Sequence, residues 1–168
     1  MNCTTAGVRV AAMLLLVAVL TGTVRAAKPL VGKVVRVTDG DSVEVLVEEG
    51  RKPYRVTLDG IDSPELPQPF GKTARQFTSD SALGKTVELS VKGRYRSRRL
   101  RARVVLPDGR DLAAALTRAG LAWWYPRRPH DYPYKYLEAE AWKARRGLWS
   151  RGDARPPWLY REAKRAVQ

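Results

Sequence analysis

Hydrophobic and polar residues alternate along three short, valine-rich segments in the first half of the chain. These segments are Lys33–Val37, Ser42–Val47 and Tyr54–Leu58. A period of two is typical of half-buried β-strands, and Asp39-Gly40-Asp41 is a turn signal between the first two. The connections are too short for crossover helices, which argues against a parallel sheet.

In three later segments the apolar residues recur every three or four positions, which is the helical spacing. The segments are Phe70–Leu83, Leu112–Ala119 and roughly Tyr132–Arg146, and they are followed by Gly84, Gly120 and Gly147. A glycine just after the last periodic residue is a helix-stop signal. Strand character returns between the first two helices, at Lys85–Lys92 and Leu100–Leu106.

Five short strands with intervening helices favour a small closed barrel. We therefore predict an α+β, mainly β fold, a five-stranded OB-fold barrel with three helices, in one domain over residues 27–160. From Ser150 onward, Pro156-Pro157-Trp158 indicates an extended segment that docks or stays mobile. Residues 161–168 are expected to form a C-terminal tail.

The N-terminal region carries the pattern of an export signal. The apolar run Val10–Leu20 follows Arg9, and Val24-Arg25-Ala26 supplies small residues for cleavage. The run is too short for a spanning helix, which needs about 20 residues. We expect residues 1–26 to be a signal peptide and the mature chain to be secreted or periplasmic, without integral membrane association. A buried N-terminal helix is the alternative. The only cysteine, Cys3, lies in this segment, so the mature chain has no disulfide.

The chain is strongly basic, with 31 Lys and Arg against 17 Asp and Glu and a net charge of +14. This excess indicates an acidic partner, either nucleic acid or an anionic surface. Six arginines lie within Arg94–Arg103, and their spacing directs Arg94, Arg96 and Arg98 to one face of a strand. We expect nucleic-acid backbone contact there, and the alternative is a solvated edge that discourages aggregation.

Acidic residues gather near the ends of two predicted strands. Asp39 and Asp41 lie in VTDGDS, and Asp62 and Glu65 lie in LDGIDSPE. Hard cations such as Ca²⁺ take oxygen ligands from carboxylates, carbonyls and water, and two loops that each donate one carboxylate supply half such a shell. Asp-Gly and Asp-Ser-Pro are also common turn formers, which is the alternative explanation.

A series of motifs in fixed order resembles the thermonuclease family of staphylococcal-nuclease-like domains. The motifs are DGDS at Asp39–Ser42, GIDSPE at Gly60–Glu65, QPFGKTARQF at Gln68–Phe77, LPDGRDL at Leu106–Leu112, AGLAWWY at Ala119–Tyr125 and EAEAWKARRGLW at Glu138–Trp149. The resemblance covers about residues 31–160. It implies an OB-fold barrel and a monomeric enzyme that cleaves DNA and RNA phosphodiesters with Ca²⁺.

The resemblance also implies roles for individual residues. Asp41 and Asp62 would be side-chain Ca²⁺ ligands, the backbone carbonyl of Ser63 would be a third, and Asp39 would lie behind them. Glu65 would orient or deprotonate the attacking water. A carboxylate within reach of a metal-positioned water is suited to accept its proton.

Two arginines of the family contact the scissile phosphate, and here the first of these positions differs. Thr57 stands five residues before Asp62, where the first arginine is expected. Arg55 lies two residues earlier and shares the strand face of Thr57, so we assign it as the catalytic candidate for this role. The second arginine position is taken by Arg99.

The stretch before Arg99 departs from the family as well. A phosphate-holding tyrosine is replaced by Ser97 and a turn glycine by Arg98. We expect Arg96, Arg98 and Arg101 to add phosphate affinity, and Tyr125 to pack near the substrate nucleotide.

The main hypothesis is an active nuclease, since a pure binder of polyanions gains nothing from carboxylates in its cleft. A non-catalytic or weakly active nucleic-acid-binding module is the alternative, supported by Thr57. Adhesion to an anionic surface through charge alone is a third.

Overall fold

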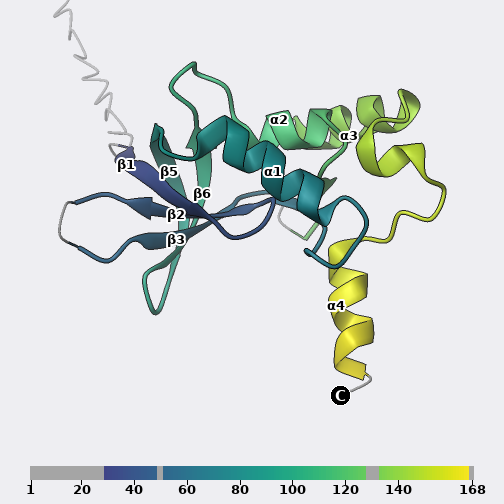
Figure 1. Cartoon of the computed structure of the whole chain (residues 1–168), viewed down its shortest axis with the longest axis horizontal. Coiled ribbons are helices and arrows are strands. Elements are labelled where there is room, and N and C mark those ends of the chain that lie inside the picture. Colours follow the sequence, from purple (N-terminus) through teal and green to yellow (C-terminus); the bar gives the residue numbers. More distant parts are fainter. Residues whose placement is uncertain (1–28, 49–50, 128–132, 167–168) are drawn as a thin grey trace, which may run out of the picture.

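The computed structural model describes residues 29–48, 51–127 and 133–166 and contains a closed five-stranded barrel (Figure 1). Its strands follow one another in the order β1-β2-β3-β6-β5. They are β1 (Leu30–Val37), β2 (Ser42–Leu46), β3 (Tyr54–Leu58), β5 (Thr86–Tyr95) and β6 (Arg99–Val105). All neighbours pair antiparallel except β3 and β6, whose parallel pairing joins the two halves of the barrel.

The barrel interior is filled by the inward-facing residues of the alternating strands. Fully buried members include Val34, Val43, Val56, Leu89 and Val104. Burial of each such side chain is worth about 1.5–3 kcal/mol relative to exposure, so the alternation fixes which face of each strand points inward.

Among the described residues, four α-helices and one 3₁₀ helix accompany the barrel. They are α1 (Gly71–Ala82), α2 (Leu112–Arg118), α3 (Tyr134–Lys143), the 3₁₀ helix (Gly147–Ser150) and α4 (Pro157–Ala166). Helix α1 lies across the barrel, and α4 extends away from the rest of the molecule (Figure 1). The side chain of Thr78 in α1 donates to the backbone carbonyl of Gly40 over 2.5 Å, which ties the helix to the turn between β1 and β2.

Asp111 connects the barrel to the helices that follow it. Its Oδ1 accepts the backbone N–H groups of Ala113 and Ala114 and caps α2. Its Oδ2 accepts from the hydroxyl of buried Tyr134 at 2.8 Å and from Arg103 Nε at 2.8 Å. One carboxylate therefore holds α2, α3 and β6 together.

The ends of α2 and α3 meet at two glycines with positive φ, 71° at Gly120 and 50° at Gly147. Leu148 N–H donates to the Gly120 carbonyl over 2.9 Å. A Cβ at either glycine would collide with backbone oxygens of the other segment, so both the conformation and the close approach require glycine.

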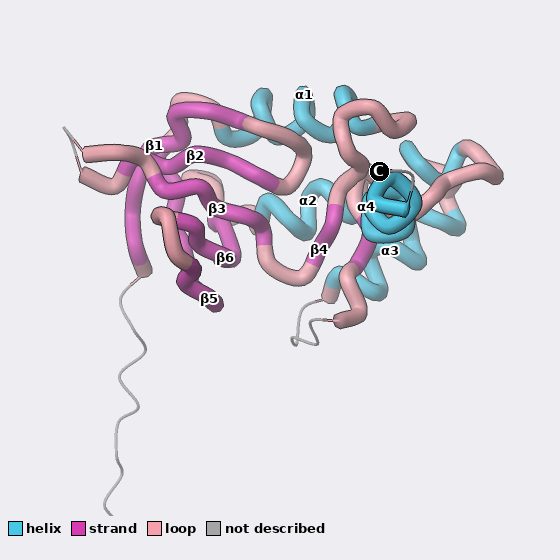
Figure 2. The backbone as a smooth tube through the Cα atoms, turned by 90° about the horizontal axis from the view of Figure 1, so that it is seen from below, coloured by secondary structure: helices cyan, strands magenta, loops and turns pink. Residues whose placement is uncertain are grey.

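A two-stranded sheet, β4 (Ile61–Asp62) with β7 (Trp123–Trp124), joins the barrel to the helical part. Figure 2 views α4 end-on, beside β4. Asp62 pairs with Trp123 in this sheet, and its carboxylate accepts hydrogen bonds from Arg161 of α4.

The predicted mainly β barrel is confirmed, and each predicted strand and each of the three predicted helices is present. Tyr54–Leu58 has the predicted ends, and the other elements are shifted at one or both ends. The expectation of an extended segment after Ser150 is wrong for Pro157–Ala166, which form α4. Proline fits the first turn of a helix because its missing N–H has no partner to lose there. This helix crosses residue 161, where we placed the start of the tail. The predicted signal peptide and Tyr132 lie outside the described residues.

Within the described part of the chain, no helix combines the length and the apolar character needed to cross a bilayer.

Candidate active site

The carboxylates singled out in the sequence line one pocket of about 220 Å³, which we call the acidic pocket. Its lining residues are Asp39, Asp41, Ser42, Thr57, Ile61, Asp62, Glu65, Tyr125 and Arg161. The structure therefore brings the two acidic loops together.

Hydrogen bonds hold the two loops side by side. The backbone N–H of Asp41 donates to Asp39 Oδ1 over 3.1 Å, and the backbone N–H of Ser63 donates to Asp41 Oδ2 over 3.2 Å. Leu58 N–H also donates to the Asp41 carbonyl over 2.8 Å. The turn before β2 and the loop after β4 are thus fixed to each other through Asp41.

Burial raises the pKa of Asp41 well above its ordinary value, and the charge and hydrogen bond of Asp39 and the charge of Asp62 raise it further. The Ser63 amide acts in the opposite direction. Crowded carboxylates of this kind are stabilised by a cation.

Asp41 and Asp62 both line the pocket, and their carboxylate oxygens fit a hard cation such as Ca²⁺, with water for the remaining ligands. Ser63, whose carbonyl is the expected third ligand, is not among the lining residues. Among the described residues, no three His, Cys, Asp or Glu side chains form a ready-made metal cluster. An ion here would therefore depend on water to complete its coordination.

A guanidinium group from α4 lies in the acidic pocket. Arg161 Nη1 is 3.1 Å from Asp62 Oδ1 and 2.8 Å from Glu65 Oε1, and Nη2 is 2.6 Å from Asp62 Oδ2. Hydrogen bonding to Asp62 first, and then to Glu65, raises the pKa of Arg161 further above its ordinary value, against the effect of burial. Arg161 therefore keeps its positive charge beside both carboxylates.

Sequence reasoning missed Arg161, which we placed in a tail. The residue lies 99 positions from Asp62, and no spacing rule connects the two. The available signal was Pro156-Pro157, which marks a helix start, followed by an arginine on the helix.

Contacts at its N-terminal end dock α4 beside the pocket. Gln68 accepts the Glu65 N–H over 2.9 Å and donates to the Arg155 carbonyl over 3.0 Å. The rings of Trp158 and Tyr125 meet edge to face with centroids 5.4 Å apart. Gln68 thus links the loop of Glu65 directly to the segment that leads into α4.

A second hollow of about 560 Å³ adjoins the acidic pocket, and we call it the arginine hollow. Its lining residues are Thr57, Tyr95, Arg96, Ser97, Arg99 and Leu100. Thr57 lines both hollows, so carboxylates and arginines lie on either side of one side chain.

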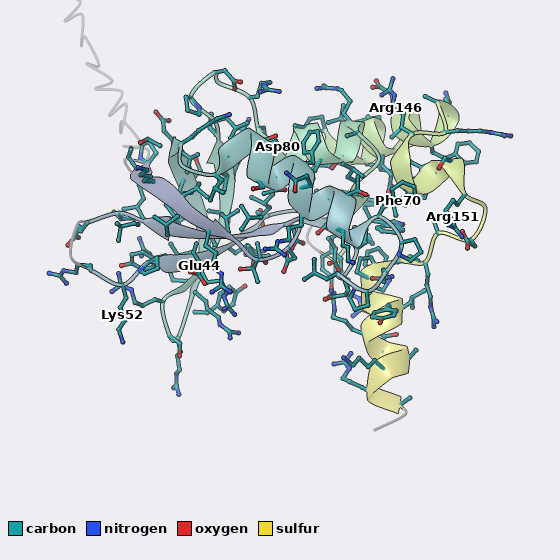
Figure 3. The ribbon with its side chains drawn as sticks, viewed as in Figure 1. Glu44, Lys52, Phe70, Asp80, Arg146 and Arg151 are labelled. Atoms are coloured by element: carbon teal, nitrogen blue, oxygen red, sulfur yellow. The ribbon has the colours of Figure 1, made fainter. Side chains whose placement is uncertain are left out.

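Two other arginines that the sequence singled out, Arg55 and Arg101, pair with carboxylates outside both hollows. Arg55 Nη2 lies 3.9 Å from Glu44 Oε1, and Arg55 lines neither hollow. Figure 3 shows Glu44 over the barrel, away from α4. Arg101, which we expected to bind phosphate, forms a 3.0 Å ion pair with buried Asp59.

The hairpin between β5 and β6 differs from the expected single basic face. The chain turns at Ser97 and Arg98, whose φ angles are 60° and 55°, so Arg98 does not continue the strand of Arg94. Its guanidinium instead lies 4.1 Å from the centre of the Tyr54 ring. The left-handed conformation of Arg98 agrees with the turn glycine that it replaces.

Comparison with known proteins places this fold and site in a family. The staphylococcal nuclease homologue family matches residues 55–151. An uncharacterized endonuclease of Escherichia coli O157:H7 is 39% identical over 133 residues, which cover 79% of this chain and 86% of the relative. A micrococcal nuclease of Shigella flexneri is 36% identical over 144 residues, covering 80% and 82%. An uncharacterized endonuclease of Haemophilus influenzae is 32% identical, covering 79% and 74%.

The chain belongs to the staphylococcal nuclease family. The predicted resemblance and the predicted class, a nuclease that hydrolyses phosphodiesters, are both confirmed. Nucleases of this family depend on a metal ion and take nucleic acid as substrate. The family match includes Asp62, Glu65 and Arg99, whereas Asp41 and Arg161 lie outside it.

Proposed function

We propose that this staphylococcal nuclease homologue hydrolyses phosphodiester bonds of DNA and RNA with Ca²⁺, by attack of a metal-positioned water. One observation carries the proposal. The acidic pocket and the arginine hollow share Thr57, so groups suited to a cation and groups suited to a phosphate lie next to each other.

Asp41 and Asp62, with the carbonyl of Ser63, are the proposed ligands. When bound there, Ca²⁺ would neutralise phosphate charge and position the water. Asp39 has the supporting role, because its Oδ1 accepts the Asp41 N–H and orients that loop.

Glu65 is the proposed general base. Its side chain is 36% exposed and lines the pocket, so a water molecule can reach it. In the reaction, the water oxygen bonds to phosphorus while its proton passes to Glu65. The bond from phosphorus to the leaving oxygen breaks, and that oxygen takes up a proton from solvent water, while Glu65 returns its proton to solvent.

The arginine hollow is the proposed path of the substrate backbone. Arg99 and Arg96 line it, and arginine suits phosphate because its planar fork donates two parallel hydrogen bonds. Tyr125 lines the acidic pocket, which supports its proposed contact with the substrate nucleotide. The net charge of +14 favours a polyanion and predicts salt-sensitive binding.

The test is cleavage of single-stranded DNA, duplex DNA and RNA by the purified chain. Each substrate is incubated with Ca²⁺, with Mg²⁺ and with chelator, alongside Glu65→Gln and the control Glu162→Gln, which changes an exposed glutamate of α4. We expect Ca²⁺-dependent cleavage that is lost in Glu65→Gln and retained in Glu162→Gln. Equal cleavage by Glu65→Gln and the parent chain would contradict the role of Glu65.

A nucleic-acid-binding module without cleavage is the second candidate, favoured by Thr57 and by the pairing of Arg55 with Glu44. Tight, salt-sensitive DNA binding with no cleavage under any of these metals would support it.

We further propose that the chain acts as a monomer in the periplasm or the medium after removal of residues 1–26. The apolar run and the small residues that follow it support this proposal. N-terminal sequencing of the exported protein tests the removal of residues 1–26, and the sedimentation coefficient tests the monomeric state.

A further inference from the structure

The acidic pocket contains the guanidinium group of Arg161, whereas the described residues of the barrel strands contribute no positively charged side chain to its lining. Thr57 lines the pocket at the position of the first family arginine, and Arg55 is paired with Glu44 instead. Among the residues that the structure describes, Arg161 is the one cationic side chain that lines this pocket.

We propose that Arg161 is a catalytic residue that donates hydrogen bonds to a non-bridging oxygen of the scissile phosphate. It would take the role of the arginine that Thr57 replaces. This inference rests on the proposed nuclease function. It assigns to α4 the first phosphate-contacting arginine, which the family resemblance places on β3 at the position of Thr57.

The guanidinium has donors left for a phosphate. Its three hydrogen bonds to Asp62 and Glu65 use three of the five N–H groups of an arginine, which leaves two. The side chain is 43% exposed and lines the pocket, so a ligand in the pocket can reach it. An ionised carboxylate has about four lone-pair sites, so Asp62 can bind Arg161 and still serve as a metal ligand.

The position of Arg161 is fixed before substrate arrives. Asp62 and Glu65 accept hydrogen bonds from the guanidinium. The Trp158–Tyr125 ring contact and the Gln68–Arg155 hydrogen bond hold the start of α4. A donor that is already oriented costs no reorganisation during the reaction. Loss of one such donor reduces the rate by about 10²–10³-fold.

Charge adds a second reason for a cation at this place. The pocket is lined by four carboxylates, from Asp39, Asp41, Asp62 and Glu65, and these would repel a phosphate. Arg161 offsets part of that charge on the side of Glu65, where the attacking water is expected.

The experiment compares Arg161→Ala, Arg161→Lys and the control Arg165→Ala, which removes the same charge from an exposed position of α4. With Ca²⁺ and one DNA substrate, we expect kcat of Arg161→Ala to fall about 10²–10³-fold. Arg161→Lys should recover only part of this loss, because an ammonium lacks the guanidinium fork. Arg165→Ala should retain kcat.

Chemical rescue separates donation by the guanidinium from a structural effect. Millimolar guanidinium chloride should increase kcat of Arg161→Ala, with no increase for the parent chain or Arg165→Ala. Tetramethylammonium chloride at the same ionic strength is the matched salt and should rescue neither. A loss of kcat without rescue, or full activity in Arg161→Lys, would overturn the proposal.

Calorimetric titration with Ca²⁺ gives a readout that does not depend on cleavage. Removal of a positive charge from the pocket should tighten Ca²⁺ binding by Arg161→Ala while cleavage slows. Weaker Ca²⁺ binding would indicate a collapsed site and overturn the proposal. Tighter binding with faster cleavage would show that Arg161 obstructs the ion, and it would overturn the proposal too.

The proposed function can fail separately from this inference. If the parent chain cleaves and Arg161→Ala cleaves equally well, only the role of Arg161 fails. If the parent chain cleaves nothing with any of the metals, both fail.

Discussion

Two aspartates that follow strand β3, Asp59 and Asp62, each pair with an arginine, but the two pairs differ in burial. Asp59 is fully buried and pairs with Arg101, whose side chain is 16% exposed. Asp62, only three residues on, is 11% exposed and pairs with Arg161, which is 43% exposed. The first pair is closed to a ligand, and the second faces a pocket.

Both pairs consist of an aspartate and an arginine, so the residue types do not separate a structural pair from a functional one. The element that carries the arginine and the exposure of the two side chains do. Arg101 is carried by a barrel strand, whose register places it opposite Thr57 next to Asp59. Arg161 comes from a helix outside the barrel and reaches the same region from the solvent side. Four predictions test this comparison.

The largest effect is expected on catalysis, from Asp62→Asn. Loss of a carboxylate charge that we assign to metal binding should reduce cleavage by at least ~10²-fold, since even residues behind metal ligands affect activity by 10–100-fold. Stability should change little because the pair is partly exposed. Cleavage rate and urea unfolding of the same preparation measure both. A large loss of stability would show that this pair, too, is structural.

Asp59→Asn should have the opposite profile. Removal of one partner from a buried pair leaves an uncompensated charge and costs about 3–5 kcal/mol. The free energy of unfolding from urea titration measures this, with Asp108→Asn as the control because that aspartate forms an exposed pair with Arg110. Stability equal to that of the control would contradict a structural role for the Asp59–Arg101 pair.

Trp158→Ala tests whether the functional pair depends on the docking of α4. Loss of the ring contact with Tyr125 should displace Arg161 and lower kcat by about 10–100-fold, the cost of a misplaced group. Trp142→Ala is the matched control, because its indole is 63% exposed. Unchanged kcat in Trp158→Ala would mean that the carboxylates alone position the guanidinium.

The smallest effect is expected for Glu138, a carboxylate that accepts the backbone N–H of Trp124 over 3.1 Å. Burial raises its pKa, and the Trp124 hydrogen bond acts in the opposite direction. The folded state therefore binds the proton more tightly than the unfolded state, and ionisation lowers stability as the pH rises.

Glu138→Gln should consequently stabilise the protein slightly near pH 7 and have less effect near pH 4. Urea unfolding at the two pH values measures this, with Glu140→Gln on the exposed face of α3 as control. A larger gain at pH 4 than at pH 7 would contradict the direction of the shift.

The barrel could be predicted because its signals are local. Valine alternation defines Tyr54–Leu58 to the residue, and Asp39-Gly40-Asp41 marks the turn that brings Asp41 to the pocket. The meeting of the loops of Asp41 and Asp62 follows from strand ends and motif order. These parts of the site were therefore accessible from the sequence.

Long-range partners were not accessible in the same way. The alternation of residues along β6 indicates that Arg101 faces outward. Only the pairing of β6 with β3 shows that Arg101 forms an ion pair with Asp59. The even spacing of Arg94, Arg96 and Arg98 suggested one strand face, and the turn at Ser97 breaks that pattern. Arg161 depends on the docking of α4, which no local pattern specifies.

The order of the elements along the chain has a consequence for biosynthesis. Helix α4 follows every other described element, so the ribosome makes the barrel, its carboxylates and the arginine hairpin before it makes Arg161. A chain in which α4 is not yet docked would thus have an acidic pocket without its guanidinium. If Arg161 donates to the phosphate as proposed, the last described helix to be synthesised completes the catalytic site.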